Sequence, residues 1–181
     1  MSTLKLNILK LHQSIGTIYV SKIKPSDLLA MSIVDRRRIE EDEGVLGIQR
    51  ELKKDKVIQI QNYLTSIDAT FPNSIIVNTT QNFVVNENET ELELTIDDNT
   101  FTIIDGQHRV EGFRDSNLDN FELLIAIFKD LENDQQANIF STINSEQTKV
   151  DPSLNLNLEL NSKAYTPKKM MIEILFSMQA A

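Results

Sequence analysis

The sequence of 181 residues contains no cysteine, and its only histidines are His12 and His108. The lack of cysteine excludes disulfides, thiolate metal sites, iron–sulfur clusters and a cysteine nucleophile. Two histidines so far apart in the sequence also exclude a His-rich metal site. The N-terminus, moreover, lacks the apolar stretch and the small-residue cleavage site of a signal peptide. Together these absences favour a protein of the reducing cytoplasm.

Long apolar runs are also missing. The longest extends from Leu123 to Phe128, which is far shorter than the roughly 18 residues that a membrane-spanning helix needs. A hydrophobic content of 40% and a charged content of 25% are those of an ordinary globular protein. A chain of 181 residues can bury a sizeable core. We therefore expect one globular domain and no membrane partner.

Acidic residues outnumber basic residues by 27 to 18, which gives a net charge of −9. Non-specific binding to DNA depends on lysines and arginines that displace counterions from phosphates. The densest basic run, Arg36-Arg37-Arg38, is followed by Glu40-Glu41-Asp42-Glu43, which largely cancels its field at a distance. We interpret these paired runs as a solvated loop. The composition predicts a poor general DNA binder, while a single local basic face stays open.

Hydrophobic periodicity predicts a mixture of strands and helices. Alternating apolar residues and short buried runs predict strands in four regions: 5–22, 74–77, 83–104 and 121–128. Helical spacing predicts five helices: 28–31, 50–66, 108–116, 131–143 and one that begins after Thr166-Pro167. This mixture, with hairpins among the strands, indicates the α+β or mixed α/β class.

The same periodicity predicts which faces are buried. An apolar stripe follows the helix at 50–66 and consists of Val57, Ile60, Leu64 and Ile67. The strands at 83–104 carry acidic residues on and beside their polar face, namely Glu87, Glu89, Glu91, Glu93, Asp97 and Asp98. We interpret this acidic patch as the wet face of a hairpin. The alternative is a site for a cation or a basic partner.

The strongest local feature is a predicted strand that leads into Asp105-Gly106-Gln107-His108-Arg109-Val110-Glu111-Gly112 and a predicted helix. The first N–H groups of a helix lack intrahelical partners and carry partial positive charge, which suits an anion. Gly106 allows a ligand to approach the backbone. Arg109 presents a planar fork of donors to phosphate oxygens, and His108 adds a donor whose charge changes near neutral pH. The junction is therefore a candidate phosphate site.

The junction also has interpretations that need no ligand. We expect Asp105 to cap the helix by accepting an N–H of its first turn. Its alternative role is to hold a magnesium ion beside a phosphate. His108 can pair with Glu111, and Arg109 with an acidic neighbour, as plain surface contacts. Gly112 is expected to let the helix pack closely on the sheet.

The run Asp105-Gly106-Gln107-His108-Arg109 resembles the signature of the DGQHR-domain family, which includes the DNA sulfur-modification protein DndB and relatives in 7-deazaguanine DNA-modification clusters. Three further blocks are similar to the family in the same order: Gly47 to Arg50, Asp68 to Ile75 and Phe140 to Val150. Members of the family are usually longer than this chain. The resemblance implies a DGQHR domain at 1–165 and a C-terminal helix at 166–181 that begins a further part.

At a greater distance the junction resembles ParB and sulfiredoxin, which implies a small mixed sheet flanked by helices. ParB carries Gly-Glu-Arg-Arg-x-x-Ala here and contacts the phosphates of CTP with it. Gly106, Arg109 and Gly112 match its Gly, second Arg and Ala. Sulfiredoxin carries Gly-Cys-His-Arg, which binds ATP phosphates. Gln107 stands in place of that catalytic cysteine, which excludes sulfinic acid reduction.

These resemblances imply a site for a nucleoside triphosphate, ATP or CTP, with Mg²⁺ as an accompanying ion. Asp105 is the candidate metal ligand and catalytic carboxylate of a weak NTPase. The downstream block 143–148 resembles ParB's Glu-Asn-x-Gln-Arg loosely, because it is one residue longer and has Thr148 where ParB has Arg. The implied phosphate-binding residues are Gly106, Gln107, His108, Arg109, Arg50, Asn144 and Gln147.

Two functions follow as hypotheses. The first is a nucleotide-binding regulator or accessory NTPase of a DNA-modification or phage-defence system. The alternative is a DndB-like, DNA-binding transcriptional regulator that makes no use of nucleotide. A ParB-like nuclease fits less well, because phosphodiester cleavage needs several clustered acidic metal ligands. The last helix presents an apolar face that suits a homo-oligomer, and we interpret its methionines, Met170, Met171 and Met178, as core filler.

Overall fold

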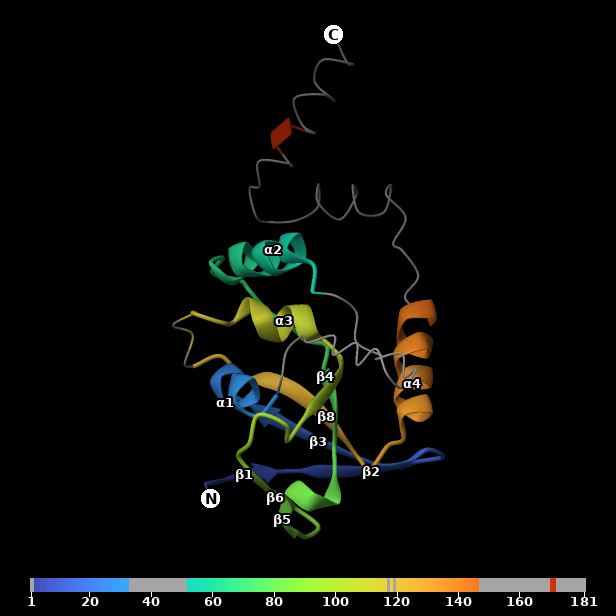
Figure 1. Ribbon diagram of the computed structural model, residues 1–181. Helices are drawn as coiled ribbons and strands as arrows, with labels where there is room; N and C mark the ends of the chain where they lie inside the picture. Colours follow the sequence, from blue (N-terminus) through green and yellow to red (C-terminus); the bar gives the residue numbers. More distant parts are fainter. Residues whose placement is uncertain (1, 33–51, 117, 119, 147–169, 172–181) are drawn as a thin grey trace, which may run out of the picture. The chain divides into compact units, whose positions relative to one another are not determined.

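The computed structural model describes residues 2–32, 52–116, 118, 120–146 and 170–171 (Figure 1). The chain divides into two compact units, Met1–Thr142 and Ile143–Ala181, and each is described by itself. The basic run at 36–38 and the acidic run after it lie outside the described residues. Their interpretation as a solvated loop therefore stays a prediction.

A five-stranded mixed sheet forms the centre of the first unit. Its order is β2 (Leu9–Gln13), β3 (Gly16–Ile23), β8 (Leu123–Lys129), β4 (Ile75–Thr79) and β7 (Thr102–Asp105). Only β4 and β8 run parallel, and the other neighbours are antiparallel. The central place of β8 fits its continuous apolar sequence, since Leu123, Ile125, Ile127 and Phe128 are buried, while Leu124 is 41% exposed.

A second, antiparallel sheet consists of β1 (Thr3–Asn7), β6 (Glu91–Thr95) and β5 (Val84–Glu87), in that order. Successive side chains of a strand point to opposite faces. In β6 this alternation buries Leu92 and Leu94 fully and leaves the residues between them half-buried. β1 continues almost directly into β2, so one stretch of chain contributes a strand to each sheet.

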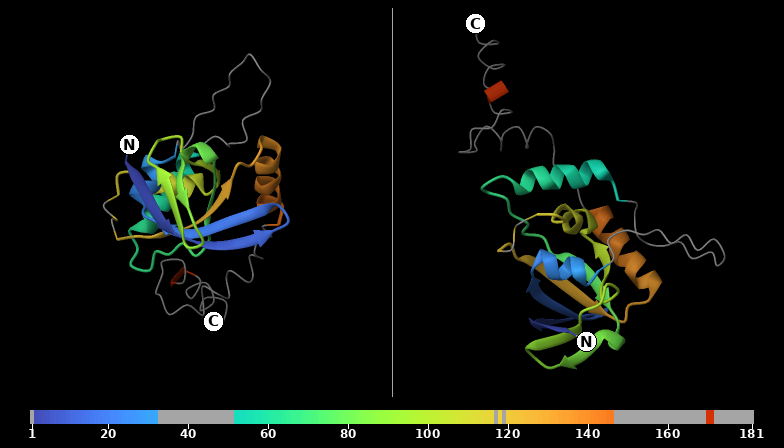
Figure 2. Two further views of the ribbon diagram at one scale, coloured as in Figure 1. Left: turned by 90° about the horizontal axis from the view of Figure 1, so that it is seen from below. Right: turned by 60° about the vertical axis from the view of Figure 1, so that its left-hand side comes forward.

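Helices cover both faces of the five-stranded sheet (Figure 2). α1 (Pro25–Ala30) and α3 (Gln107–Gly112) share one face, and α2 (Lys54–Leu64) packs on the outside of α3. The larger core lies on this face and includes Leu28 of α1 and Val110 of α3.

The opposite face of the sheet carries α4 (Asn133–Glu146). Ile139 and Phe140 of this helix pack against a smaller cluster formed by Ile18, Ile104 and Phe128 of the strands. A short 3₁₀-helix (Gln81–Phe83) links β4 to β5. The junction between β7 and α3 connects the edge of the five-stranded sheet to the helices α3 and α2 on the other face.

The predicted mixed α/β class is confirmed. The apolar stripe of α2 is confirmed for Val57 and Leu64, which are buried, and for Ile60, which packs against the core. The prediction was wrong for Ile67, which is fully exposed. The reason is that α2 ends at Leu64 with Thr65 as its C-cap, so Ile67 lies beyond the helix.

The described residues include no helix that is long and apolar enough to cross a membrane. Of the predicted last helix, only Met170 and Met171 are described. Both are helical and exposed, so neither fills a core in this structure. The domain boundary at residue 165 falls outside the described residues and stays a prediction.

Candidate functional site

A single residue, Gly106, turns the chain from β7 into α3. Its φ of 100° and ψ of 8° lie in the left-handed region, which side-chain-bearing residues rarely adopt. A Cβ at this position would meet Ile75 Cδ1 at 2.6 Å and Arg109 Nη2 at 3.1 Å. The fold itself therefore requires glycine here, independently of any ligand.

Arg109 forms part of the frame of this junction. Its Nη1 donates to the carbonyl oxygen of Asn73 at 2.7 Å, and its Nη2 donates to the carbonyl oxygen of Ser74 at 3.1 Å. Nη2 also donates to Asp105 Oδ2 at 3.0 Å, which confirms the expected acidic neighbour. These bonds use three of the five N–H donors of a guanidinium. Burial lowers the pKa of Arg109, and the Asp105 carboxylate opposes this shift.

Asp105 does not cap α3, contrary to the prediction. The N-cap residue is Gly106, which has no side chain to cap the helix, and the Asp105 carboxylate accepts from Arg109 instead. Asp105 is the last residue of β7, and Arg109, four residues later, takes its carboxylate as an ion-pair partner at 3.0 Å. Among the described residues no group of three or more Asp, Glu or His side chains could hold a metal ion.

The imidazole of His108 joins α3 to the start of α2. Its Nε2 accepts the backbone N–H of Lys53, the N-cap residue of α2, at 3.1 Å. A nitrogen that accepts a hydrogen bond carries no proton, so this contact requires an unprotonated Nε2. Glu111, which the sequence offered as a partner for His108, makes a two-point contact with Arg114 at 2.6 and 2.9 Å.

Gly112 allows close packing, but against α2 and not against the sheet as predicted. A Cβ at this position would collide with Cγ2 of Ile60. Helical periodicity identified a position without room for a side chain, and it could not tell which neighbouring element takes that room. The correction matters for the site, because it shows that the side chain of Ile60 of α2 packs against the backbone of α3 at Gly112, six residues after Gly106.

The sequence matches the model of the family DndB, described as DNA-sulfur modification-associated, over residues 6–177. The chain belongs to the DndB family. A solved structure with a similar fold is that of the C-terminally truncated chromosome-partitioning protein ParB from Caulobacter crescentus, complexed with CTP-gamma-S. The TM-score is 0.50 and the identity 10%, and the match covers 83% of this chain and 68% of that chain. At this identity the likeness establishes the fold alone. Among curated proteins, none is significantly similar.

The described part of the candidate site in this DndB-family chain is the segment from Asp105 to Arg109, with Gln107 as the first residue of α3. Arg50 and Gln147 lie outside the described residues. Asn144 lies on α4, in the second compact unit. The part that these three residues take in the site stays a prediction.

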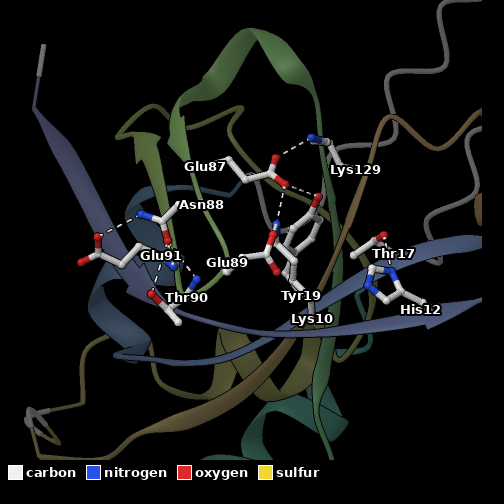
Figure 3. Close-up of polar contacts among 10 residues, drawn as sticks. All are labelled: Lys10, His12, Thr17, Tyr19, Glu87, Asn88, Glu89, Thr90, Glu91 and Lys129. Atoms are coloured by element: carbon white, nitrogen blue, oxygen red, sulfur yellow. Dashed lines mark hydrogen bonds and ion pairs between the residues drawn. The ribbon is translucent and has the colours of Figure 1, made fainter.

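A second polar cluster, which the sequence did not predict, joins the two sheets (Figure 3). The carboxylate of Glu87 accepts hydrogen bonds from Lys129 Nζ at 2.6 Å and from the Tyr19 hydroxyl at 2.9 Å. Lys10 Nζ lies 3.4 Å from the same carboxylate and donates to Glu89 at 3.2 Å. Both ammonium groups lie within 6 Å of the Tyr19 ring centroid, at 5.9 and 5.8 Å. The cluster ties β5 to β2, β3 and β8.

The environment of Glu87 corrects the interpretation of the acidic patch. Burial alone would raise the pKa of Glu87, but the hydrogen bonds from Lys129 and Tyr19 outweigh it and lower that pKa. The side chain of Glu87 is 23% exposed, whereas that of Glu89 is 88% exposed. A wet hairpin face thus describes Glu89 but not Glu87, which is an inter-sheet contact.

Proposed function

We propose that this DndB-family protein binds the phosphates of a nucleoside triphosphate, ATP or CTP, at the junction from Gly106 to Arg109. The observation that carries the proposal is the turn at Gly106, where the backbone passes in the left-handed conformation from a strand into a helix, beside the guanidinium of Arg109. The start of a helix is a ready site for phosphate. The similar ParB structure is complexed with CTP-gamma-S, which supports a nucleotide as the ligand.

The protein would then act as a regulator or accessory NTPase of a DNA-modification or phage-defence system. Family membership supports the link to DNA modification. In this proposal the backbone after Gly106 and the side chains of the first turn of α3 contact phosphate. Arg109 supplies positive charge and keeps the junction in place. The proposed phosphate-binding residues of the junction are Gly106, Gln107, His108 and Arg109. A role for Arg50, Asn144 and Gln147 stays a prediction from the sequence.

Asp105 is the proposed ligand of Mg²⁺ and, if hydrolysis follows, the carboxylate that orients water. No cluster of carboxylates surrounds it in the described part of the chain. The ion would therefore take its other ligands from phosphate oxygens and water, as Mg²⁺ commonly does. Arg109 already holds the same carboxylate, so metal and guanidinium would compete for it. Hydrolysis would rest on positioning and charge stabilisation.

A thermal-shift titration of the full chain with ATP, CTP, GTP and UTP, with and without Mg²⁺, tests the proposal. A ligand that binds only the native state raises its melting temperature by mass action. We expect ATP or CTP to stabilise the wild type and the matched control Arg114→Ala, an exposed arginine just after α3. The shift should vanish in Arg109→Ala when each variant is compared with its own ligand-free form. No shift with any nucleotide in the wild type would overturn the proposal.

The second candidate is a DNA-binding transcriptional regulator, which is compatible with a family described as DNA-sulfur modification-associated. Fluorescence anisotropy with DNA from upstream of a modification operon separates the two. Binding that weakens steeply with salt and ignores ATP and CTP indicates the regulator, because phosphate contacts release counterions. A nucleotide shift without DNA binding indicates the first function. The net charge of −9 weighs against the regulator.

A further inference from the structure

Lysines that make no ion pair gather at the start of α2 in the described part of the chain. Both arginines of this part contact a carboxylate, and so do four of its lysines, namely Lys5, Lys10, Lys22 and Lys129. The described lysines without an acidic partner are Lys24 and the group at the start of α2, namely Lys53, Lys54 and Lys56. These three α2 lysines form an unbalanced positive patch in a chain of net charge −9.

The α2 lysines are exposed, and the helix directs them toward the side of α3. The apolar stripe of α2 faces α3, since Ile60 packs against Gly112. At 3.6 residues per turn, Lys54 and Lys56 border this stripe on its two sides. Asp55, the only acidic residue of the first turn, points to the opposite side of the helix. The patch therefore keeps its positive charge.

The carboxylates of the neighbouring elements are already engaged. Asp105 of the junction binds Arg109, and Glu111, the only acidic residue of α3, binds Arg114. The α2 lysines lie beside these groups, because the backbone N–H of Lys53 donates to His108 of α3 at 3.1 Å. Neither carboxylate forms an ion pair with the patch in the described part of the chain.

The positive patch does not stabilise the helix that carries it. The macrodipole of a helix places partial positive charge at its start, so cations there are unfavourable. The α2 lysines are exposed and belong to no core cluster. A concentration of one sign of charge that the fold does not use attracts a partner of the opposite sign.

We propose that the α2 lysines contact the phosphate backbone of double-stranded DNA. A small phosphate ligand is held in a concave site by a few fixed polar groups, whereas exposed ammonium groups on flexible stems suit an extended anionic surface. Such contacts position DNA without reading its sequence. The description of the family as DNA-sulfur modification-associated favours DNA over other polyanions. The inference rests on the second candidate function, DNA binding, and requires no nucleotide.

Fluorescence anisotropy of the full chain with a short labelled DNA duplex of mixed sequence, over a series of salt concentrations, tests the contact. Each phosphate contact contributes about 0.9 to the slope of log affinity against log salt. Lys54→Gln/Lys56→Gln should therefore bind more weakly than the wild type, with a slope smaller by about 1.8. Lys5→Gln/Lys22→Gln is the matched control, because it removes two exposed, paired lysines and changes the net charge equally. Its slope should stay at the wild-type value.

Melting temperatures and nucleotide shifts of the same variants separate the outcomes. Lys54→Gln/Lys56→Gln should melt no lower than the wild type, since it removes positive charge from the start of a helix. If the wild type binds the duplex and this variant binds it equally, the lysine contact is wrong and the second candidate function stands. If the wild type does not bind at low salt, both are wrong. A variant that keeps DNA binding but loses the nucleotide-induced shift would assign the lysines to the nucleotide site and contradict the proposal.

Discussion

We expect Arg109 to stabilise the folded protein even when no ligand is bound. Arg109→Ala removes three charge-assisted hydrogen bonds, to Asn73, Ser74 and Asp105. Each such bond contributes about 1.5–3 kcal/mol in a favourable case. The side chain is 18% exposed, and water can replace part of this loss at the carbonyl groups. We therefore expect a loss of roughly 3 kcal/mol, and at about 2–4 °C per kcal/mol the melting temperature should fall by roughly 6–12 °C.

Thermal and urea denaturation, followed by circular dichroism without ligand, measure this loss. Arg114→Ala is the control, because its contact with Glu111 lies at the surface and exposed ion pairs contribute about 0–1 kcal/mol. Arg109→Lys should fall between the two, since an ammonium keeps the charge but cannot reach all three acceptors in the geometry of a planar fork. An Arg109→Ala variant as stable as Arg114→Ala would refute the structural role derived for Arg109.

Three further outcomes are expected. Gly106→Ala should lower the melting temperature, because it combines a φ of 100° with a close approach to Ile75. Gly112→Ala should also destabilise the fold, and trimming the colliding side chain with Ile60→Ala should recover part of that loss in a double-mutant cycle by urea denaturation. Glu87→Gln should be less stable than the wild type at neutral pH. Because the folded pKa of Glu87 is lowered, its contribution is present above the unfolded pKa and lost as pH falls through the folded one. The two proteins should therefore converge in stability as the pH falls well below the ordinary glutamate pKa of about 4.3, and a constant gap would contradict the assignment.

The sequence predicted well what depends on near neighbours in the chain. Strand alternation at Leu92 and Leu94, the central strand β8 and the strand–Gly106–helix junction are local patterns, and the structure contains all of them. The packing partner of each helix face was harder to predict, because periodicity shows that a face is apolar but not which element covers it. Gly112 was placed against the sheet for that reason, although Ile60 of α2 lies there.

Contacts between distant parts of the chain left no local signal. Arg109 bonds to carbonyl groups 36 and 35 residues away, and Glu87 bonds to a lysine 42 residues away. An arginine can donate to any acceptor oxygen on a neighbouring loop, so its sequence neighbours do not indicate its partner. The partners of Arg109 and Glu87 follow only from the order of the strands in the sheets. The expectation that Asp105 caps the helix failed for a different, local reason. The helix amides and Arg109 compete for the one carboxylate, and Arg109 binds it.

The fold itself requires the junction motif, and this limits how the motif could hold the proposed ligand. Gly106 is fixed by its backbone conformation, Arg109 by three acceptors and His108 by the N–H of Lys53. A bound phosphate would therefore rely mainly on backbone amides and on net positive charge, which Arg109→Lys preserves. If Arg109→Lys loses stability but keeps the nucleotide-induced rise in melting temperature, Arg109 positions the junction. If it loses that rise beyond what its stability explains, the guanidinium itself contacts phosphate.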